Sequence, residues 1–144
     1  MGRFSAKLTE HFHAPRNAGA LEDADVIGRG SLDDRAPYTT LYLKITNQTV
    51  ARCGFQTFGC GVSIACASVL TELLIGQTID AGRAITAESV IEALDGIPDD
   101  KRFCAEVVVS ALCDALKEWA LQEEQVEINA RESCDGNYEI QGDS

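Results

Sequence analysis

The most reactive residues in this sequence are its six cysteines, and Cys60 has the surroundings that would best activate a thiol. It stands between two glycines in the run Phe58-Gly59-Cys60-Gly61-Val62, where a strand-like pattern gives way to a helix-like one. A thiol just before a helix meets unpaired N–H groups and the positive end of the helix dipole, and both favour the thiolate. Thiolate is the form that binds metal or attacks sulfur. The alternative for Cys60 is a small buried side chain at a tight turn.

Cys104 is the second candidate, because it falls in the first turn of a helix expected to begin near Asp100. Lys101 and Arg102 precede it and would stabilise a thiolate charge. Cys113 follows nine residues later. At about 100° per residue the two thiols lie on opposite faces of that helix, so Cys113 cannot join a site at Cys104. We expect it to be a packing residue.

The other three cysteines are weaker candidates. Cys66 lies six residues after the first candidate, about one turn inside the next helix. A core position is expected for it, although a place at the edge of a metal site stays open. Cys53 shares a strand face with Ala51 and Phe55, which predicts a packed side chain. Cys134 stands alone near the C-terminus and is expected to be an incidental thiol.

The two histidines, His11 and His13, fall in a short N-terminal helix and in the loop that follows it. A metal-binding role would require them to approach Cys60, and sequence spacing gives no indication of that. We therefore expect both side chains at the surface.

The composition indicates which cellular compartment and which classes of binding partner to expect. Six cysteines without an apolar export signal indicate a reducing compartment, and the cytoplasm is the expected location. No stretch approaches the roughly 18 apolar residues of a membrane span. Residues 1–60 carry seven Lys/Arg against six Asp/Glu, whereas residues 61–144 carry five against seventeen. This chain lacks the basic footprint of a nucleic-acid-binding protein. Its acidity would suit a basic protein partner or serve solubility.

Hydrophobic periodicity predicts an α+β fold, a small three-stranded antiparallel sheet with helices packed on it. Strand-like alternation covers residues 26–30, 41–45 and 49–58, with Asn47-Gln48 as the turn of a hairpin. Helical periodicity covers residues 5–13, 62–75, 86–96 and 100–119. Gly76 is expected to stop the second of these helices, and Thr86 to cap the third with Ser89 three residues on.

Residues 1–121 are expected to form one domain. Residues 122–144 carry seven acidic residues against Arg131 alone, without sustained apolar periodicity. We interpret them as an acidic, mobile C-terminal tail. A short strand at residues 125–128 or 137–140 is the alternative.

Three segments together resemble one family. Residues 4–19 resemble its opening helix and N-P-R-N-x-G signature, and residues 55–72 resemble its F-x-T-F-G-C-G-x-x-I-A-x-x-S-x-x-T-E block. Residues 98–104 resemble its P-x-x-K-x-H-C segment. On this basis the chain resembles the NifU/IscU-type, SufU-like, iron–sulfur cluster scaffold family. The resemblance implies the fold of the SufE/NifU superfamily.

The resemblance also implies a function. Members of this family accept sulfur from a cysteine desulfurase, take up iron, assemble a [2Fe–2S] cluster and deliver it to client apo-proteins. Some bind zinc at the same site, and a related branch carries sulfur. Their ligands are three cysteines, supported by an Asp and a His. Cys60 matches the second cysteine and Cys104 the third.

This sequence departs from the family pattern at the other ligand positions. Thr39 occupies the place of the first cysteine, the Asp has no counterpart, and Phe103 stands where the His would be. Residues 97–101 also differ from the L-P-P-V-K segment that some members present to a chaperone. The resemblance therefore does not carry the chaperone interaction over to this chain.

Two thiols leave a metal site incomplete, because a [2Fe–2S] cluster ordinarily takes four protein ligands and zinc takes four, or three with water. Cys60 and Cys104 supply two. Cys66, Asp33, Asp34, a second protomer or bound thiols could supply the rest. Thr39 is a poor substitute, since a neutral hydroxyl is a much weaker ligand than thiolate.

The sequence thus predicts a scaffold or sulfur carrier rather than a turnover enzyme. Cys60 is the expected sulfur acceptor and ligand, Cys104 the second ligand, and residues 4–19 the docking region for the desulfurase. One alternative is an interaction or regulatory module that keeps the fold and binds no cluster or metal. The other is a zinc-binding sulfur-transfer protein whose ligands include Cys66 or an acidic residue.

Overall fold

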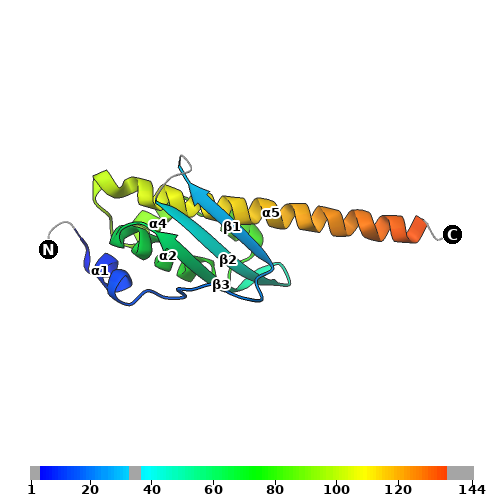
Figure 1. Cartoon of the computed structure of the whole chain (residues 1–144), viewed down its shortest axis with the longest axis horizontal. Coiled ribbons are helices and arrows are strands. Elements are labelled where there is room, and N and C mark those ends of the chain that lie inside the picture. Colours follow the sequence, from blue (N-terminus) through cyan, green and yellow to red (C-terminus); the bar gives the residue numbers. More distant parts are fainter. Residues whose placement is uncertain (1–3, 33–36, 136–144) are drawn as a thin grey trace.

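The structure is a computed structural model that describes residues 4–32 and 37–135. Its centre is a three-stranded antiparallel sheet in the order β1-β2-β3. The strands are β1 (Val26–Ser31), β2 (Tyr38–Thr46) and β3 (Thr49–Phe58). Helices α2 (Gly61–Leu74) and α5 (Arg102–Asp135) pack against the sheet (Figure 1). The predicted α+β fold, a three-stranded antiparallel sheet with helices packed on it, is confirmed.

The β2–β3 hairpin contains an irregularity that the sequence pattern did not reveal. The register shifts between Lys44 and Ile45, so that β3 has one residue more than its partner at this point. As a result Val50 and Cys53 are both buried, while Ala51 between them is exposed. The prediction that Cys53 is packed is confirmed. The prediction that it shares a face with Ala51 is wrong, because the bulge switches the alternation.

Positive φ angles occur in the turn between β2 and β3 and just after the end of α2. Asn47 and Gln48 have φ values of 53° and 62°, the left-handed pair that a tight two-residue hairpin requires. Gly76, with φ at 89°, follows the end of α2. The predicted hairpin turn and the predicted stop at Gly76 are both confirmed.

Two glycines of β1 allow α5 to lie directly on the sheet. A Cβ atom on Gly28 would stand 2.2 Å from the carbonyl oxygen of Ala111, and one on Gly30 would stand 2.2 Å from Oγ of Ser110. Any larger residue would push α5 away from β1. This close approach fixes the helix that carries Cys104 against the sheet.

The remaining helical segments are α1 (Ala6–His13), α3 (Ile79–Arg83), α4 (Ala87–Ala93) and the 3-10 turn η1 (Asp99–Lys101). Ser5 caps α1, its hydroxyl accepting a hydrogen bond from the backbone N–H of Leu8. Thr86 and Ser89 form a reciprocal capping box at the start of α4, as predicted. The short helix α3 has too few residues to leave a periodic signal, and it was not predicted.

Helix α5 is longer than its sequence pattern indicates. It was expected to end near Trp119, yet it runs to Asp135 and projects beyond the rest of the molecule (Figure 1). Apolar periodicity fades because residues 120–130 are exposed, while Gln, Glu and Ala still favour helix. Residues 122–135 are helical, so the alternative prediction of a strand at residues 125–128 is wrong. Residues 137–140 lie outside the described residues, and a domain boundary at residue 121 with a mobile tail stays a prediction.

Neither α5, despite its length, nor any other helix in the described part of the chain is long and apolar enough to cross a membrane.

Candidate functional site

Cys60 occupies the N-cap position of α2, with φ −88° and ψ −179°. Its side chain is exposed. At both flanking glycines, Gly59 and Gly61, an added Cβ atom would come too close to a neighbouring side chain. A Cβ on Gly59 would stand 2.7 Å from Oγ of Ser63, and one on Gly61 would stand 2.7 Å from the ring of Phe12. The turn therefore presents the thiol to solvent while the chain around it remains closely packed.

Cys104 lies directly behind Cys60. The two sulfur atoms are 3.9 Å apart, and Cys104 has no solvent exposure. The buried hydroxyl of Ser63 donates a hydrogen bond to Sγ of Cys104 at 3.3 Å. The structure thus brings together the two cysteines that the sequence singled out, one facing solvent and one beneath it.

The surroundings shift the pKa values of the two thiols in opposite directions. Partial burial raises the pKa of Cys60, but the backbone N–H groups of Ser63 and Val62, the Cys104 thiol and the charge of Lys101 outweigh it. The net effect is a lowered pKa for Cys60, as its place at a helix start predicted. Burial dominates for Cys104 and raises its pKa to about 11, although the Ser63 hydroxyl acts in the opposite direction.

The two basic residues before Cys104 have different partners. Arg102 pairs with Glu88 and, at 3.7 Å, with Glu106. Lys101 lowers the pKa of both thiols through its charge. Its Nζ also lies 6.0 Å from the centre of the Phe103 ring.

A complete metal-ligand set is not present among the described residues. No group of three or more His, Cys, Asp or Glu side chains in residues 4–32 and 37–135 is placed to hold a metal ion. Thr39 is buried, and its hydroxyl lies 3.0 Å from that of Thr57, so it belongs to a polar pair within the sheet. Asp33 and Asp34 lie outside the described residues.

Cys66 and Cys53 are core residues. Both are fully or almost fully buried, and burial raises the pKa of Cys53 to about 12 and that of Cys66 further still. The core position expected for Cys66 is confirmed. Cys113 is exposed, so the prediction that it packs in the core is wrong. It does lie on the opposite face from Cys104, and because Cys104 faces the core, Cys113 faces solvent. The side chain of Cys134 lies outside the described residues.

The prediction that both histidines lie at the surface is correct for His13 and wrong for His11. His11 is 4% exposed, and its Nδ1 lies 2.7 Å from Oγ of Ser68. Its Nε2 lies 3.4 Å from a carboxylate oxygen of Glu72, which also faces Arg16. This network holds α1 and the loop after it against α2. Ser68 and Glu72 are four residues apart on one helix face, and that spacing is the signal that could have indicated a partner helix.

Exposed aromatic side chains border the cysteine pair. Phe58, two residues before Cys60, is 60% exposed and stacks on Tyr38 with ring centres 5.4 Å apart. Phe12, whose ring stands over Gly61, is also exposed. Large exposed apolar side chains of this kind are typical of a protein-binding surface.

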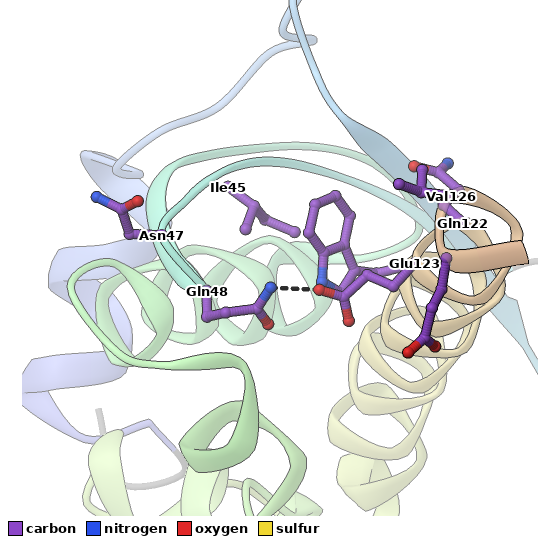
Figure 2. Close-up of a pocket in the computed structure, with 8 residues that line it drawn as sticks. Ile45, Asn47, Gln48, Gln122, Glu123 and Val126 are labelled. Carbon is purple, nitrogen blue, oxygen red and sulfur yellow. Dashed lines mark hydrogen bonds between the residues drawn. The ribbon is translucent and has the colours of Figure 1, made fainter. Parts of the chain in front are cut away.

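A groove in the described part of the chain lies away from the cysteine pair. This groove of about 650 Å³ at the turn end of the hairpin lies between Asn47-Gln48 and the overhang of α5 (Figure 2). Gln48 donates a hydrogen bond to Glu123 in this groove. The indole N–H of Trp119 is buried there without a partner in the described structure. No cysteine or histidine lines the groove, so it is not the site of thiol chemistry.

The site thus combines an exposed thiol at a helix start with a buried thiol beneath it, on an antiparallel sheet backed by helices. The family model for the NifU-like N terminal domain matches residues 3–126 of the chain. The chain therefore belongs to the NifU/IscU-type scaffold family, as the sequence motifs predicted.

Two relatives illustrate the match. The iron–sulfur cluster assembly scaffold protein IscU 1 of Archaeoglobus fulgidus is 37% identical over 116 residues, which cover 81% of this chain and 76% of that protein. The scaffold protein IscU of Aquifex aeolicus is 32% identical over 126 residues, covering 86% of this chain and 80% of the relative.

A solved structure supports the fold. The protein from Fervidobacterium islandicum AW-1, assigned as an iron–sulfur cluster assembly scaffold for the SUF system, superposes with a TM-score of 0.63. The match covers 78% of this chain and 96% of that one, at 20% sequence identity. It supports the fold, while family membership rests on the sequence relatives.

Proposed function

We propose that this protein serves iron–sulfur cluster assembly as a sulfur-accepting scaffold or carrier, with Cys60 receiving sulfur from a cysteine desulfurase. The supporting observation is the thiol pair: Cys60 is exposed, has a lowered pKa and lies 3.9 Å from Cys104. An accessible thiolate attacks the sulfane sulfur of a persulfide, which is the chemistry of sulfur transfer. The family relationship supplies the context, since the relatives are named as cluster assembly scaffolds.

Docking of the desulfurase is proposed at the face that carries Cys60. Phe12, Tyr38 and Phe58 are exposed there, and residues 4–19 lie on the same side through α1, which packs on α2. The sulfur formed from cysteine would then reach Cys60 without passing through solvent. Client apo-proteins would use the same face after the desulfurase has left. Chaperone binding is not part of this proposal, because residues 97–101 depart from the segment that supports it.

Iron or a [2Fe–2S] cluster is the cargo in this proposal, and the described residues do not form a complete cradle for it. Cys60 and Cys104 give two ligands where four are needed. The remaining ligands would come from a second protomer, from bound thiols, or from Asp33 or Asp34. Of the family's two tasks, sulfur acceptance is the one that the described residues support.

We place this role in the cytoplasm. The five described cysteines are free thiols, which suits a reducing compartment.

Anaerobic reconstitution with iron, cysteine and a desulfurase tests the proposal. Uptake of sulfur that is lost in Cys60→Ala and kept in Cys113→Ser supports it, since both residues are exposed thiols. Absorption bands of thiolate-to-iron charge transfer, with iron and sulfide in equal amounts, would extend the role to cluster assembly. A chain that takes up neither sulfur nor iron would contradict the proposal.

The second candidate function is an interaction module that binds assembly partners without cluster or metal. The absence of three metal-binding side chains together in the described residues favours it. Affinity for the desulfurase that is unchanged in Cys60→Ala, with no sulfur uptake by the native chain, would identify it. About one zinc per chain after metal loading, lost in Cys104→Ala, would instead identify a zinc-binding sulfur-transfer protein.

A further inference from the structure

The two thiols at the site differ in depth. Cys60 is exposed at the start of α2, whereas Cys104 is fully buried 3.9 Å behind it. Because Cys60 is exposed, a sulfur atom added to it can extend toward solvent, away from the buried Cys104. In that arrangement the Cys104 sulfur stands on the opposite side of Cys60 from the added sulfur. This is the in-line geometry of thiol–disulfide exchange, in which a thiol attacks one sulfur while the other leaves.

We propose that the Cys60–Cys104 pair reduces the sulfur that Cys60 accepts, releasing it as sulfide and closing a Cys60–Cys104 disulfide. This activity rests on the proposed function, because it begins with a persulfide on Cys60. It gives the site a chemical product, sulfide, that two cysteines can make without a metal ligand set.

The atoms and electrons of this step balance within the chain. The Cys104 thiol, whose pKa is raised by burial, first gives up its proton. Its thiolate then forms a bond to the Cys60 sulfur, and the bond between Cys60 and the added sulfur breaks. The added sulfur leaves with the bonding electron pair and the proton of Cys104, as hydrogen sulfide. It is reduced by two electrons, and the two cysteine thiols are oxidised to the disulfide. A further round requires an external dithiol reductant that reopens the disulfide.

The distances suit this reaction for Cys104 and for no other described cysteine. A disulfide has an S–S length of about 2.05 Å, so the two sulfurs must approach by about 2 Å, which side-chain rotation at a helix start can supply. Cys53 and Cys66 are sealed in the core, and Cys113 faces solvent on the far side of α5. Ser63, hydrogen-bonded to Cys104, holds that sulfur beside Cys60 in the reduced chain.

The replacement of ligand residues that the family resemblance implies fits the same interpretation. Thr39 and Phe103 leave two thiols where the family has three with an Asp and a His. Two thiols are too few for a four-ligand cluster and sufficient for a disulfide. The site of this chain is thus suited to producing sulfide for a cluster that is completed with other ligands.

The test uses the full chain and a persulfidated cysteine desulfurase from which free cysteine and reductant have been removed. The two proteins are mixed without oxygen or iron. Sulfide is trapped with a bimane reagent, and alkylated peptides are fragmented by mass spectrometry to assign persulfide and disulfide to individual cysteines. The native chain is expected to release about one sulfide per chain and to form the Cys60–Cys104 disulfide.

Three variants test whether sulfide release depends on the Cys104 thiol. Cys104→Ala and Cys104→Ser are expected to retain the sulfur on Cys60 and to release sulfide at least about tenfold more slowly than the native chain. Cys113→Ser should behave as the native chain does. Denaturation midpoints establish that each variant is folded. Should both Cys104 variants fail to fold, the disulfide and sulfide yields of the native chain decide the matter by themselves.

The outcomes separate this inference from the proposed function. Persulfide that remains on Cys60 in the native chain, without sulfide or disulfide, overturns the inference alone. Sulfide release at an equal rate from the Cys104 variants overturns it as well. No sulfur on Cys60 in any of the proteins overturns both the inference and the proposed sulfur acceptance.

Discussion

The sulfur atoms of Cys60 and Cys104 lie 3.9 Å apart although 44 residues separate them in the sequence. The first is held by the start of α2 and the second by the start of α5, and these two helices pack against each other. One thiol faces solvent, and the other is buried beneath it. The packing of the two helices therefore places one thiol of the pair at the surface and the other beneath it.

The reactivity of Cys60 should reflect its lowered pKa. We expect the pH midpoint of its alkylation by iodoacetamide to fall below that of a cysteine in an unstructured peptide. Cys104→Ala and Lys101→Met remove a hydrogen-bond partner and a positive charge that stabilise the thiolate, so each should raise that midpoint. Alkylation is followed by mass spectrometry, with the exposed Cys113 as the reference thiol. A midpoint at or above that of the peptide cysteine in the native chain would contradict the assignment.

Protonation of His11 should destabilise the fold. Burial lowers the pKa of His11, and the charge of Glu72 offsets this only in part. The unfolded chain therefore binds more protons than the native chain between the lowered pKa and about 6.5, the value of an unperturbed histidine. The stability that His11 contributes is complete above about pH 6.5 and is lost as the pH falls through its folded pKa.

His11→Asn, which can keep a polar atom near Ser68, tests this linkage. Urea denaturation near pH 7.5 and near pH 5.5 should show a larger loss of stability in the native chain than in the variant. The other charges around His11, those of Lys7, Glu10, Arg16 and Glu72, are common to both proteins and cancel in the difference. Equal losses in the two proteins would show that His11 does not titrate in this range.

A cysteine at position 39 should strengthen metal binding. The motif resemblance predicts that Thr39 takes the place of the family's first cysteine. Thr39 is buried on β2, whereas Thr40 points to the opposite face of the sheet. Thr39→Cys is expected to raise the iron retained after anaerobic reconstitution and gel filtration by about tenfold, because thiolate is a far stronger ligand than a hydroxyl. Thr40→Cys is the matched control. Equal iron in the two variants would show that position 39 does not face the site.

The overhang of α5 should contribute little to stability. Residues 120–130 are all exposed, and in the described structure Glu123 makes a hydrogen bond to the hairpin turn through Gln48. A chain that stops at Leu121 should lose less than about 1 kcal/mol of unfolding free energy. Leu112→Ala, in the buried part of the same helix, should lose about 2–5 kcal/mol. A truncation as costly as Leu112→Ala would contradict a domain boundary at residue 121.

Local sequence patterns predicted the elements and the cysteine pair well, because these depend on nearby residues. The alternation of β2, the Asn47-Gln48 turn and the capping box at Thr86 each follow from a few adjacent side chains. Cys60 was identified by its own turn. Its proximity to Cys104 was implied by the family motifs, and the structure supplies the distance.

Features that depend on distant contacts were missed. His11 is buried because Ser68, 57 residues later, meets its ring. The bulge that exposes Ala51 is a property of strand pairing. Helix α5 continues past Trp119 without the apolar periodicity that normally marks a helix, because residues 120–130 are exposed. Of these contacts, the one with His11 leaves only an indirect signal, the polar pair Ser68 and Glu72 four residues apart on α2.

The central claim is that Cys60 accepts sulfur, and the position of sulfur delivered by a cysteine desulfurase tests it most directly. The Cys104→Ala chain, in which the sulfur should be retained, is incubated with desulfurase and isotopically labelled cysteine without iron or reductant. Persulfides are then alkylated and assigned by peptide fragmentation. The account predicts label on Cys60 in about one chain equivalent and none above background on Cys113. Label on Cys113 in equal amount, or a chain without label, would contradict it.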